Sequence, residues 1–287
     1  MLSDAGIPVG NVDGEHSIAI GEKSRVKDGS QFAMAIGYDA MAAKDNTLAV
    51  GTSAAAGSKG SIAIGSKAKA NYGFNAMALG NEATAFGTQS VAIGYQSQVK
   101  IADHKKQSAD NAIALGTGAK VNVAEKAKSA DNAIALGKNA TIEAVSDHAT
   151  VNNAIAIGTN SYVKGGESIA IGNDAEALNS NAVAIGRESE AKGGHSVALG
   201  YQSHAVKEGT TALGYYAQAN GDHSVAVGER SSAGTEAIAL GYLSQAGKNA
   251  VALGDHSVAE EGTVSVGNDT LKRRVTNAAD ARFEKRL

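Results

Sequence analysis

The sequence predicts an all-β, parallel solenoid in which short turns of chain stack along one axis. The segment Ser17–Gly21, which reads SIAIG, returns as Ser61–Gly65 and Ser168–Gly172, and in close variants almost to the C-terminus. The closing glycines recur about every 14 residues, a fixed short period that is typical of a stacked repeat. The residues before each glycine alternate between large aliphatic and small, and alternation at period two is typical of a β-strand.

The repeat is complete seventeen times, with a few changes of spacing. The last three spacings are one residue shorter than the usual one, and three in the middle are longer by seven or eight. The closing glycines are Gly21, Gly37, Gly51, Gly65, Gly80, Gly94, Gly116, Gly137, Gly158, Gly172, Gly186, Gly200, Gly214, Gly228, Gly241, Gly254 and Gly267.

Each turn is expected to hold two short strands and two corners. The first strand ends at the glycine, with large aliphatic residues one and three positions before it and alanine two positions before it, until Ser265 in the last copy. In the second strand, the third and fifth residues after the glycine are small or aliphatic until Lys272, whereas the fourth varies from Arg25 to His204. The third and fifth should therefore face inward and the fourth should face solvent. Each strand should pair in parallel with its counterpart about 4.8 Å along the axis.

The alanine column of the first strand is predicted to contact another subunit. The column tolerates only small side chains, which indicates a closely approaching backbone, and the large aliphatic residues would then fill the core. The opposite assignment, with the aliphatic residues at the subunit contact, stays open; it would leave an all-small core, thinner than the usual ~10 Å between packed sheets. The candidate trimer-interface residues are Ala63, Ala92, Ala114, Ala135, Ala156, Ala170, Ala184, Ala198 and Ala226.

Composition excludes several classes of protein. The net charge of −3 gives no overall basic character to suggest nucleic acid, and the absence of cysteine excludes disulfides and thiolate metal sites. No apolar run approaches the roughly 18 residues that a membrane helix needs. Met1–Gly10 lacks the features of a signal peptide, so a secreted parent protein would make this chain a mature or excised piece.

The chain is expected to divide into three parts. Residues 1–16 should form an irregular N-terminal cap, in which the single proline, Pro8, would discourage end-to-end strand addition. Residues 17–267 should form the roll. Residues 268–287 stop the pattern and are rich in helix formers, which indicates a connector leading into a helix.

Three consecutive turns are longer by seven or eight residues, around 101–110, 122–131 and 143–152. Because the additions follow the second strand at the same phase, we expect them to leave the same corner and stack. Loops on a rigid scaffold commonly carry binding, so we interpret them as candidate ligand-binding loops; a solvated polar excursion remains the alternative. The candidate ligand-binding residues are His104, Lys105, Lys106, Lys126 and Lys128.

The pattern Asn/Ser-x-Ala-Ile-Gly-x-x-Ser/Ala, recurring at this spacing, resembles the head repeats of trimeric autotransporter adhesins, the YadA-like group. Asn181–Ser189 and Ser90–Ser97 are close matches, and the resemblance covers about 17–267. It implies a left-handed parallel β-roll that assembles as a homotrimer about a threefold axis. It also implies a virulence-related protein at the bacterial cell surface, anchored at the outer membrane. Such a protein binds host extracellular matrix proteins, glycosaminoglycans or cell receptors.

The segment Val264–Gly267, followed by Arg274–Ala279, resembles the family's neck, which joins the head to a coiled-coil stalk. Ala279 and Asp280 depart from the usual ending of the neck. The neck residues indicated are Arg274, Thr276 and Asn277. The signal peptide, the stalk and the membrane barrel of the family are expected outside this chain.

Other functions fit the sequence less well, and neither enzyme activity nor a cofactor is predicted. Acyltransferases with a left-handed β-helix use longer turns built from six-residue units, and His16, His195 and His223 sit at corners without a fixed carboxylate or nucleophile partner. Calcium β-rolls need G-G-x-G-x-D, which Gly165–Ser168 and Gly193–Ser196 lack. The alternative function is a passive structural spacer that holds a binding tip away from the cell.

Overall fold

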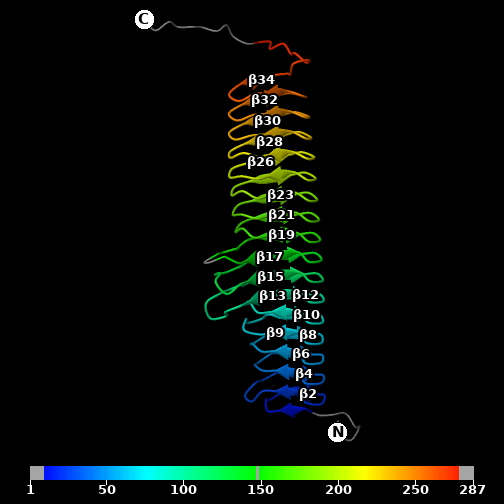
Figure 1. Cartoon of the computed structure of the whole chain (residues 1–287). Helices are drawn as coiled ribbons and strands as arrows, with labels where there is room; N and C mark the ends of the chain where they lie inside the picture. The colour runs from blue at the N-terminus through cyan, green and yellow to red at the C-terminus, as the bar shows by residue number, and fades with distance from the viewer. Residues whose placement is uncertain (1–9, 147–148, 278–287) are drawn as a thin grey trace.

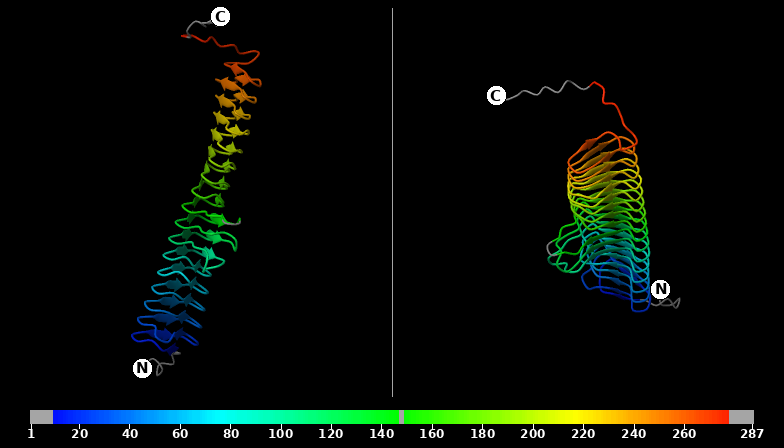
Figure 2. Two further views of the ribbon diagram at one scale, coloured as in Figure 1. Left: turned by 90° about the vertical axis from the view of Figure 1, so that its left-hand side faces the viewer. Right: turned by 45° about the horizontal axis from the view of Figure 1, so that its top comes forward.

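The structure, a computed structural model, describes residues 10–146 and 149–277. The chain coils into a long rod, with the first and the last described residues at its opposite ends (Figure 1). Two sheets run the length of the rod, and the views in Figure 2 show the turns stacked one above another, with a bulge at the three long turns. No helix occurs within these described ranges. The predicted all-β parallel solenoid is confirmed.

The first sheet contains the strands that precede the closing glycines, and each has two or three residues. Its members, in order along the rod, are β2 (Ile18–Ile20), β4 (Met34–Ile36), β6 (Leu48–Val50), β8 (Ile62–Ile64), β10 (Met77–Leu79), β12 (Val91–Ile93), β14 (Ile113–Leu115), β16 (Ile134–Leu136), β18 (Ile155–Ile157), β20 (Ile169–Ile171), β22 (Val183–Ile185), β24 (Val197–Leu199), β26 (Thr211–Leu213), β28 (Val225–Val227), β30 (Ile238–Leu240), β32 (Val251–Leu253) and β34 (Val264–Ser265).

The second sheet contains the strands that follow the glycines, and three of them are lengthened to four residues. Its members are β1 (Asn11–Val12), β3 (Arg25–Val26), β5 (Met41–Ala42), β7 (Ala55–Ala56), β9 (Lys69–Ala70), β11 (Thr84–Ala85), β13 (Gln98–Ile101), β15 (Lys120–Val123), β17 (Thr141–Ala144), β19 (Tyr162–Val163), β21 (Glu176–Ala177), β23 (Glu190–Ala191), β25 (His204–Ala205), β27 (Gln218–Ala219), β29 (Ser232–Ala233), β31 (Gln245–Ala246) and β33 (Val258–Ala259).

Every strand pairs in parallel and in register with its counterpart one turn away. In the first sheet, Ala170 of β20 lies opposite Ala184 of β22, and in the second sheet Glu176 of β21 lies opposite Glu190 of β23. The pairing begins earlier than expected, because β1 pairs with β3 through Asn11 opposite Arg25. The prediction of an irregular cap over 1–16 is therefore wrong at Asn11 and Val12; residues 1–9, with Pro8, lie outside the described residues.

The core is made of small side chains, and the predicted facing of the first strand is wrong. The alanine two positions before each glycine is buried inside its own chain, while the aliphatic residues on either side of it are half-buried or exposed. Ala63, Ala92, Ala114, Ala135, Ala156, Ala170, Ala184, Ala198 and Ala226 are all 0% exposed in the single chain. They therefore cannot form a subunit interface, and the large aliphatic residues, which were expected in the core, face outward instead.

Narrow turns explain the small core. The two strands of a turn are joined by corners of only a few residues, so their inner faces lie close together and admit alanine and serine rather than isoleucine. The second strand behaves as predicted: Ala177 and Ala191 face inward and are buried, whereas Glu176 and Glu190 face outward. The alanines of the two sheets form one cluster that runs along most of the rod.

Most serine and threonine hydroxyls in the core are satisfied by carbonyl groups of the corners. Ser90 Oγ donates to the carbonyl of Gly87 at 2.6 Å, and Thr210 Oγ1 donates to the carbonyl of Lys207 at 2.7 Å. The same bond recurs in turn after turn, as from Ser203 Oγ to Gly200 O at 3.0 Å. A buried hydroxyl without a partner would be destabilising, so this local bond explains why serine can alternate with alanine in the core.

The closing glycines are required by stacking as well as by backbone conformation. Gly200 has a φ of 137°, and a Cβ built on it would lie 2.5 Å from the carbonyl oxygen of Gly214 in the next turn. Two residues later the chain enters the left-handed region again, as at Gln202 with a φ of 49°. From Gly21 to Gly241, a Cβ on any closing glycine would meet the backbone of the next one in the column.

Candidate functional site

The outer face of the first sheet carries two large apolar side chains in almost every turn of the rod; β26, with Thr211, is an exception. Leu199 in β24 is 39% exposed, Leu253 in β32 is 36% exposed, and Val264 at the end of the column is 72% exposed. Their partial burial comes from neighbours in the adjacent turns, since each stacks in register on the next, as Ile185 does on Leu199. We call this continuous surface the aliphatic face. Contiguous exposed apolar patches of this kind mark interaction surfaces.

The three long turns form a ledge on one side of the rod, visible beside β13, β15 and β17 in Figure 1. The chain leaves the roll after Ile101, Val123 and Ala144, which are buried and extend the core outward. The returning segments pair with one another through parallel bridges from Ser108 to Ser129 and from Ser129 to Thr150. The loops therefore stack on each other, as their common phase in the repeat predicts.

Backbone and side-chain hydrogen bonds hold the ledge together. The Gln107 amide donates to the carbonyls of Ala124 and Ala127 in the next loop, and its oxygen accepts from the Asp103 backbone amide. Asp131 accepts from the Asp110 amide at 2.8 Å and from Ser108 Oγ at 2.9 Å. Because these groups are used within the ledge, its outline is fixed by the fold rather than by a ligand.

All five cationic candidates lie exposed on the first two loops: His104, Lys105 and Lys106 on the first, and Lys126 and Lys128 on the second. Lys106 Nζ lies 3.9 Å from Asp103, an exposed ion pair that leaves most of the lysine in solvent. The structure thus brings the five onto one ledge, in adjacent turns. Asp147, on the third loop, lies outside the described residues.

The aromatic residues at the base of the ledge explain Phe86, for which the sequence pattern offers no role. The His104 ring stacks on Tyr72 with 4.0 Å between ring centroids, and Tyr72 meets Phe86 edge to face at 5.0 Å. Phe86 also packs against the alanine core. The three rings therefore support the first loop from below and orient His104 on the ledge.

A polar ladder borders the ledge on the outer face of the second sheet. Asn122 in β15 donates to Glu143 in β17 at 3.3 Å, and Tyr162 in β19 donates to Glu143 at 3.1 Å. Burial of the phenol and the neighbouring Glu143 carboxylate together raise the pKa of Tyr162 to about 12. The tyrosine therefore stays neutral and keeps donating at any physiological pH.

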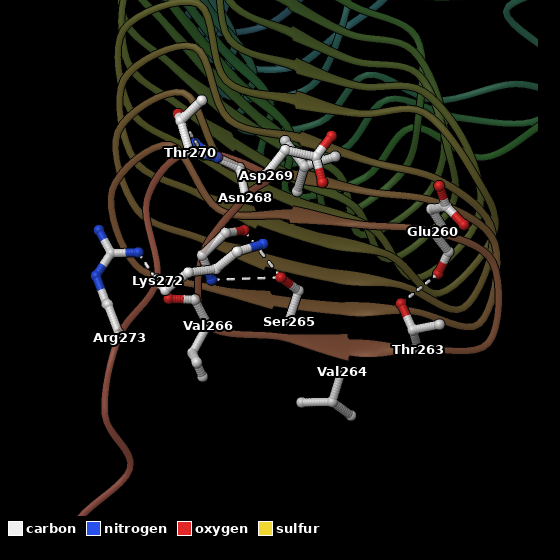
Figure 3. Close-up of a pocket in the computed structure, with 12 residues that line it drawn as sticks. Glu260, Thr263, Val264, Ser265, Val266, Asn268, Asp269, Thr270, Lys272 and Arg273 are labelled. Carbon is white, nitrogen blue, oxygen red and sulfur yellow. Dashed lines mark hydrogen bonds between the residues drawn. The ribbon is translucent and has the colours of Figure 1, made fainter.

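The C-terminal end of the roll is closed by a side chain that sequence reasoning missed. Arg273 donates to the carbonyls of Val266 at 2.7 Å and Asp255 at 2.6 Å, and to Ser257 Oγ at 3.1 Å. Arg273 also lines a hollow of about 680 Å³ beside the last strand; the residues that line this hollow are drawn in Figure 3. The only sequence signal of Arg273 was its place between Lys272 and Arg274, a run of three cations.

The three predicted neck residues, Arg274, Thr276 and Asn277, are exposed and lie in irregular backbone. The expected helix falls on residues 278–287, outside the described residues. Within the described part of the chain, no three His, Asp or Glu side chains gather closely enough to hold a metal ion. No described segment is a helix long and apolar enough to span a membrane.

Comparison with known proteins gives one family. The chain matches the model of the YadA head domain repeat over residues 31–54, 72–97, 108–140, 148–161, 164–189, 177–203, 191–217, 205–231 and 232–257, more than half of its length. The crystal structure of the collagen-binding domain of the Yersinia adhesin YadA is similar at 25% sequence identity with a TM-score of 0.39. That match covers 61% of this chain and 90% of that one. No curated protein matches the sequence.

Proposed function

Because this chain belongs to the family of YadA head domain repeats, we propose that it forms the head of a trimeric adhesin on a bacterial surface. The full-length protein would be anchored at the outer membrane by parts outside this chain. The head would act by binding rather than by catalysis, on host extracellular matrix proteins, glycosaminoglycans or cell receptors.

The observation that carries the proposal is the aliphatic face. A rod with two half-exposed aliphatic side chains in almost every turn presents a long, straight apolar surface to water. Such a surface favours association with a matching one, and a second copy of the rod offers the same length and the same spacing of turns. That three copies assemble, and that each chain coils in the left-handed sense, are predictions taken from the family.

The ledge of long turns is our proposed ligand-binding region. It holds His104, Lys105, Lys106, Lys126 and Lys128 on a molecule whose overall net charge is −3. In a trimer the ledge recurs three times around the rod, so weak contacts can give strong binding through avidity. Sulfated polysaccharides and acidic patches on matrix proteins are the ligands that such a surface suits. The neck, with Arg274, Thr276 and Asn277, would lead towards the stalk.

The testing experiment is a binding screen with the soluble head. Matrix proteins, glycosaminoglycans and purified cell receptors are immobilised, and binding is measured at low and at raised salt. We expect saturable binding to at least one class, weakened by salt because exposed charges are screened. A well-folded oligomer that binds none of the panel at any salt concentration would leave the passive spacer as the better function.

A further inference from the structure

Two corners border the aliphatic face, one on each side. The glycine corner comprises the two residues after a closing glycine, and the entry corner comprises the residues six and five positions before it. Suppose that copies form a closed ring with their aliphatic faces inward. All first strands then run in the same direction around the ring, so the glycine corner of one copy meets the entry corner of the next. With three or more copies in the ring, such a contact is heterologous.

The glycine corners from Gly186 to Gly228 carry a compact cluster, which we call the tyrosine–arginine corner. Tyr201 and Tyr215 stack with 5.4 Å between ring centroids, and Tyr216 meets both edge to face. The Arg187 guanidinium lies 5.0 Å from the Tyr201 ring, and Arg230 lies 5.7 Å from Tyr215. The ring faces are thus largely occupied. Arg187 pairs with Glu188 at 2.8 Å and Arg230 with Glu229 at 3.4 Å, both at exposed positions. Because a guanidinium has five N–H donors, each arginine keeps donors that can meet a partner.

The entry corners of the same turns have complementary size and charge. Tyr201 is level with Gly194, Tyr216 with Glu208, and Arg230 with Asp222, and both acidic residues are exposed. Nothing within its own chain requires glycine at position 194. A Cβ there would come no closer than 3.9 Å to an atom of another turn, and the φ of Gly194 is not left-handed. A glycine with free space around it is expected where another chain packs closely.

We propose that the tyrosine–arginine corner is a contact between copies of this chain and docks on the entry corner of its neighbour. Tyr201 packs over the flat surface at the neighbour's Gly194, and the phenol and guanidinium groups donate to the neighbour's Glu208 and Asp222. The proposal rests on the oligomer of the proposed function and adds the residues that fix its vertical register. The complementarity of the two corners is restricted to these turns. In the turn of Gly65, for example, Lys67 of one copy would face Lys59 of the next, so that like charges would meet.

A partner copy fits better than an outside ligand for two reasons. The occupied ring faces leave little room for the stacking by which tyrosine binds sugars or bases, whereas hydroxyls and guanidinium groups suit carboxylates. The corner is also continuous with the aliphatic face, so any close packing of that face brings a second chain to it. An extended glycan or peptide would have no reason to need Gly194.

The absence of cysteine in the chain allows a clean cross-linking test. Tyr201→Cys and Gly194→Cys are combined in one chain and treated with a short bis-maleimide. Within a chain the two positions lie at opposite ends of β24, roughly 20 Å apart at the rise of a strand, farther than the reagent reaches. We expect most of the chain to become covalent oligomers on a denaturing gel, and Gln218→Cys with Gly194→Cys, the matched control, to stay uncross-linked.

The result separates this inference from the proposed function, because the oligomeric state is measured in parallel by sedimentation. An oligomer that gives no cross-link, or one equal to the control, overturns the corner contact and leaves the oligomer standing. A monomeric parent chain overturns both. Saturable binding of an oligosaccharide to the tyrosines of the intact oligomer would also overturn it, since the corner would then be open.

A charge swap between Arg230 and Asp222 gives a second, independent test of the contact. Arg230→Asp and Asp222→Arg should each lower the thermal midpoint of the oligomer, and their combination should recover it, because the pair is restored between chains. Asp is acceptable at position 230, where the backbone is left-handed with a φ of 54°. If the losses in thermal midpoint of the two single variants simply add in the double variant, the pairing of Arg230 with Asp222 is contradicted.

Discussion

Ala170 and Ile171 are neighbours in β20 that face opposite ways: Ala170 is fully buried in the core of its own chain, and Ile171 lies half-buried on the outer surface of the first sheet. The same relationship holds in turn after turn. A single chain therefore buries its smallest apolar residues and presents its largest to the outside. This inversion is the physical reason to expect that the rod is stable only as part of an assembly.

Buried hydroxyls can be tested with a matched pair. Ser90 Oγ donates to Gly87 O, so Ser90→Ala should lower the free energy of unfolding by about 0.5–1.5 kcal/mol. Ser224 Oγ is buried without a hydrogen-bond partner, so Ser224→Ala should be neutral or stabilising. Chemical denaturation of both variants gives the comparison, and equal losses at the two sites would contradict the role of the corner carbonyl.

The glycine column should be intolerant of any side chain. Gly200→Ala places a methyl group 2.5 Å from Gly214 O at a φ of 137°, so we expect a loss of about 2 kcal/mol or more, or failure to fold. Gly29 has a left-handed φ of 74° but no atom within 4 Å of the added Cβ, and Gly29→Asn should change stability by less than about 1 kcal/mol. Thermal unfolding followed by circular dichroism distinguishes the two; similar melting points would show that stacking does not require the column.

The Tyr162–Glu143 contact should give a measurable pH dependence. Since the pKa of Tyr162 is raised to about 12, its stabilising contribution is present below the ordinary pKa near 10 and is lost as pH rises towards 12. Ultraviolet titration should show a late-titrating phenol that disappears in Tyr162→Phe. Glu143→Gln should move that phenol to lower pH, because it removes the carboxylate that opposes ionisation. No difference between Glu143→Gln and the parent would contradict the assignment.

Adhesion should depend on the ledge. Lys105→Glu with Lys106→Glu reverses two exposed charges without touching the core, so we expect unchanged melting and weaker binding to a sulfated polysaccharide. Binding of the parent should fall with added salt, and the double variant should be less sensitive to salt. Lys69→Glu and Lys248→Glu, which lie outside the ledge, serve as the control. A head whose three long turns are cut to the ordinary length of the repeat but which binds as well as the parent would move adhesion elsewhere on the roll.

The sequence was sufficient for the architecture because the repeat carries it directly. The spacing of the closing glycines predicted the length of each turn, and the alternation of large and small residues predicted the strands. The varied fourth residue after each glycine predicted the outward face of the second sheet. The common phase of the three insertions also predicted that the loops stack. These features depend on local spacing, which a sequence shows.

The facing of the first strand could not be obtained in the same way. Alternation at Ala170 and Ile171 shows that two faces differ, but not which one is inside. The usual separation of packed sheets favoured isoleucine in the core, whereas the short corners at Gly172 and its equivalents leave room only for alanine and serine. Arg273 was missed for a related reason, since its partners Val266 and Asp255 are backbone carbonyls exposed only where the roll ends.

Sedimentation velocity of a variant of the aliphatic face tests the central claim most directly. Ile171→Asp, Ile185→Asp and Leu199→Asp place carboxylates in three consecutive turns of the first sheet, where assembly would bury them side by side. Gln218→Asp, Ser232→Asp and Gln245→Asp place the same charges on the outward column of the second sheet. We predict dissociation towards monomers for the first set and a parental oligomer for the second. An oligomer of unchanged size and stability in the first set would show that the aliphatic face is not where the chains meet.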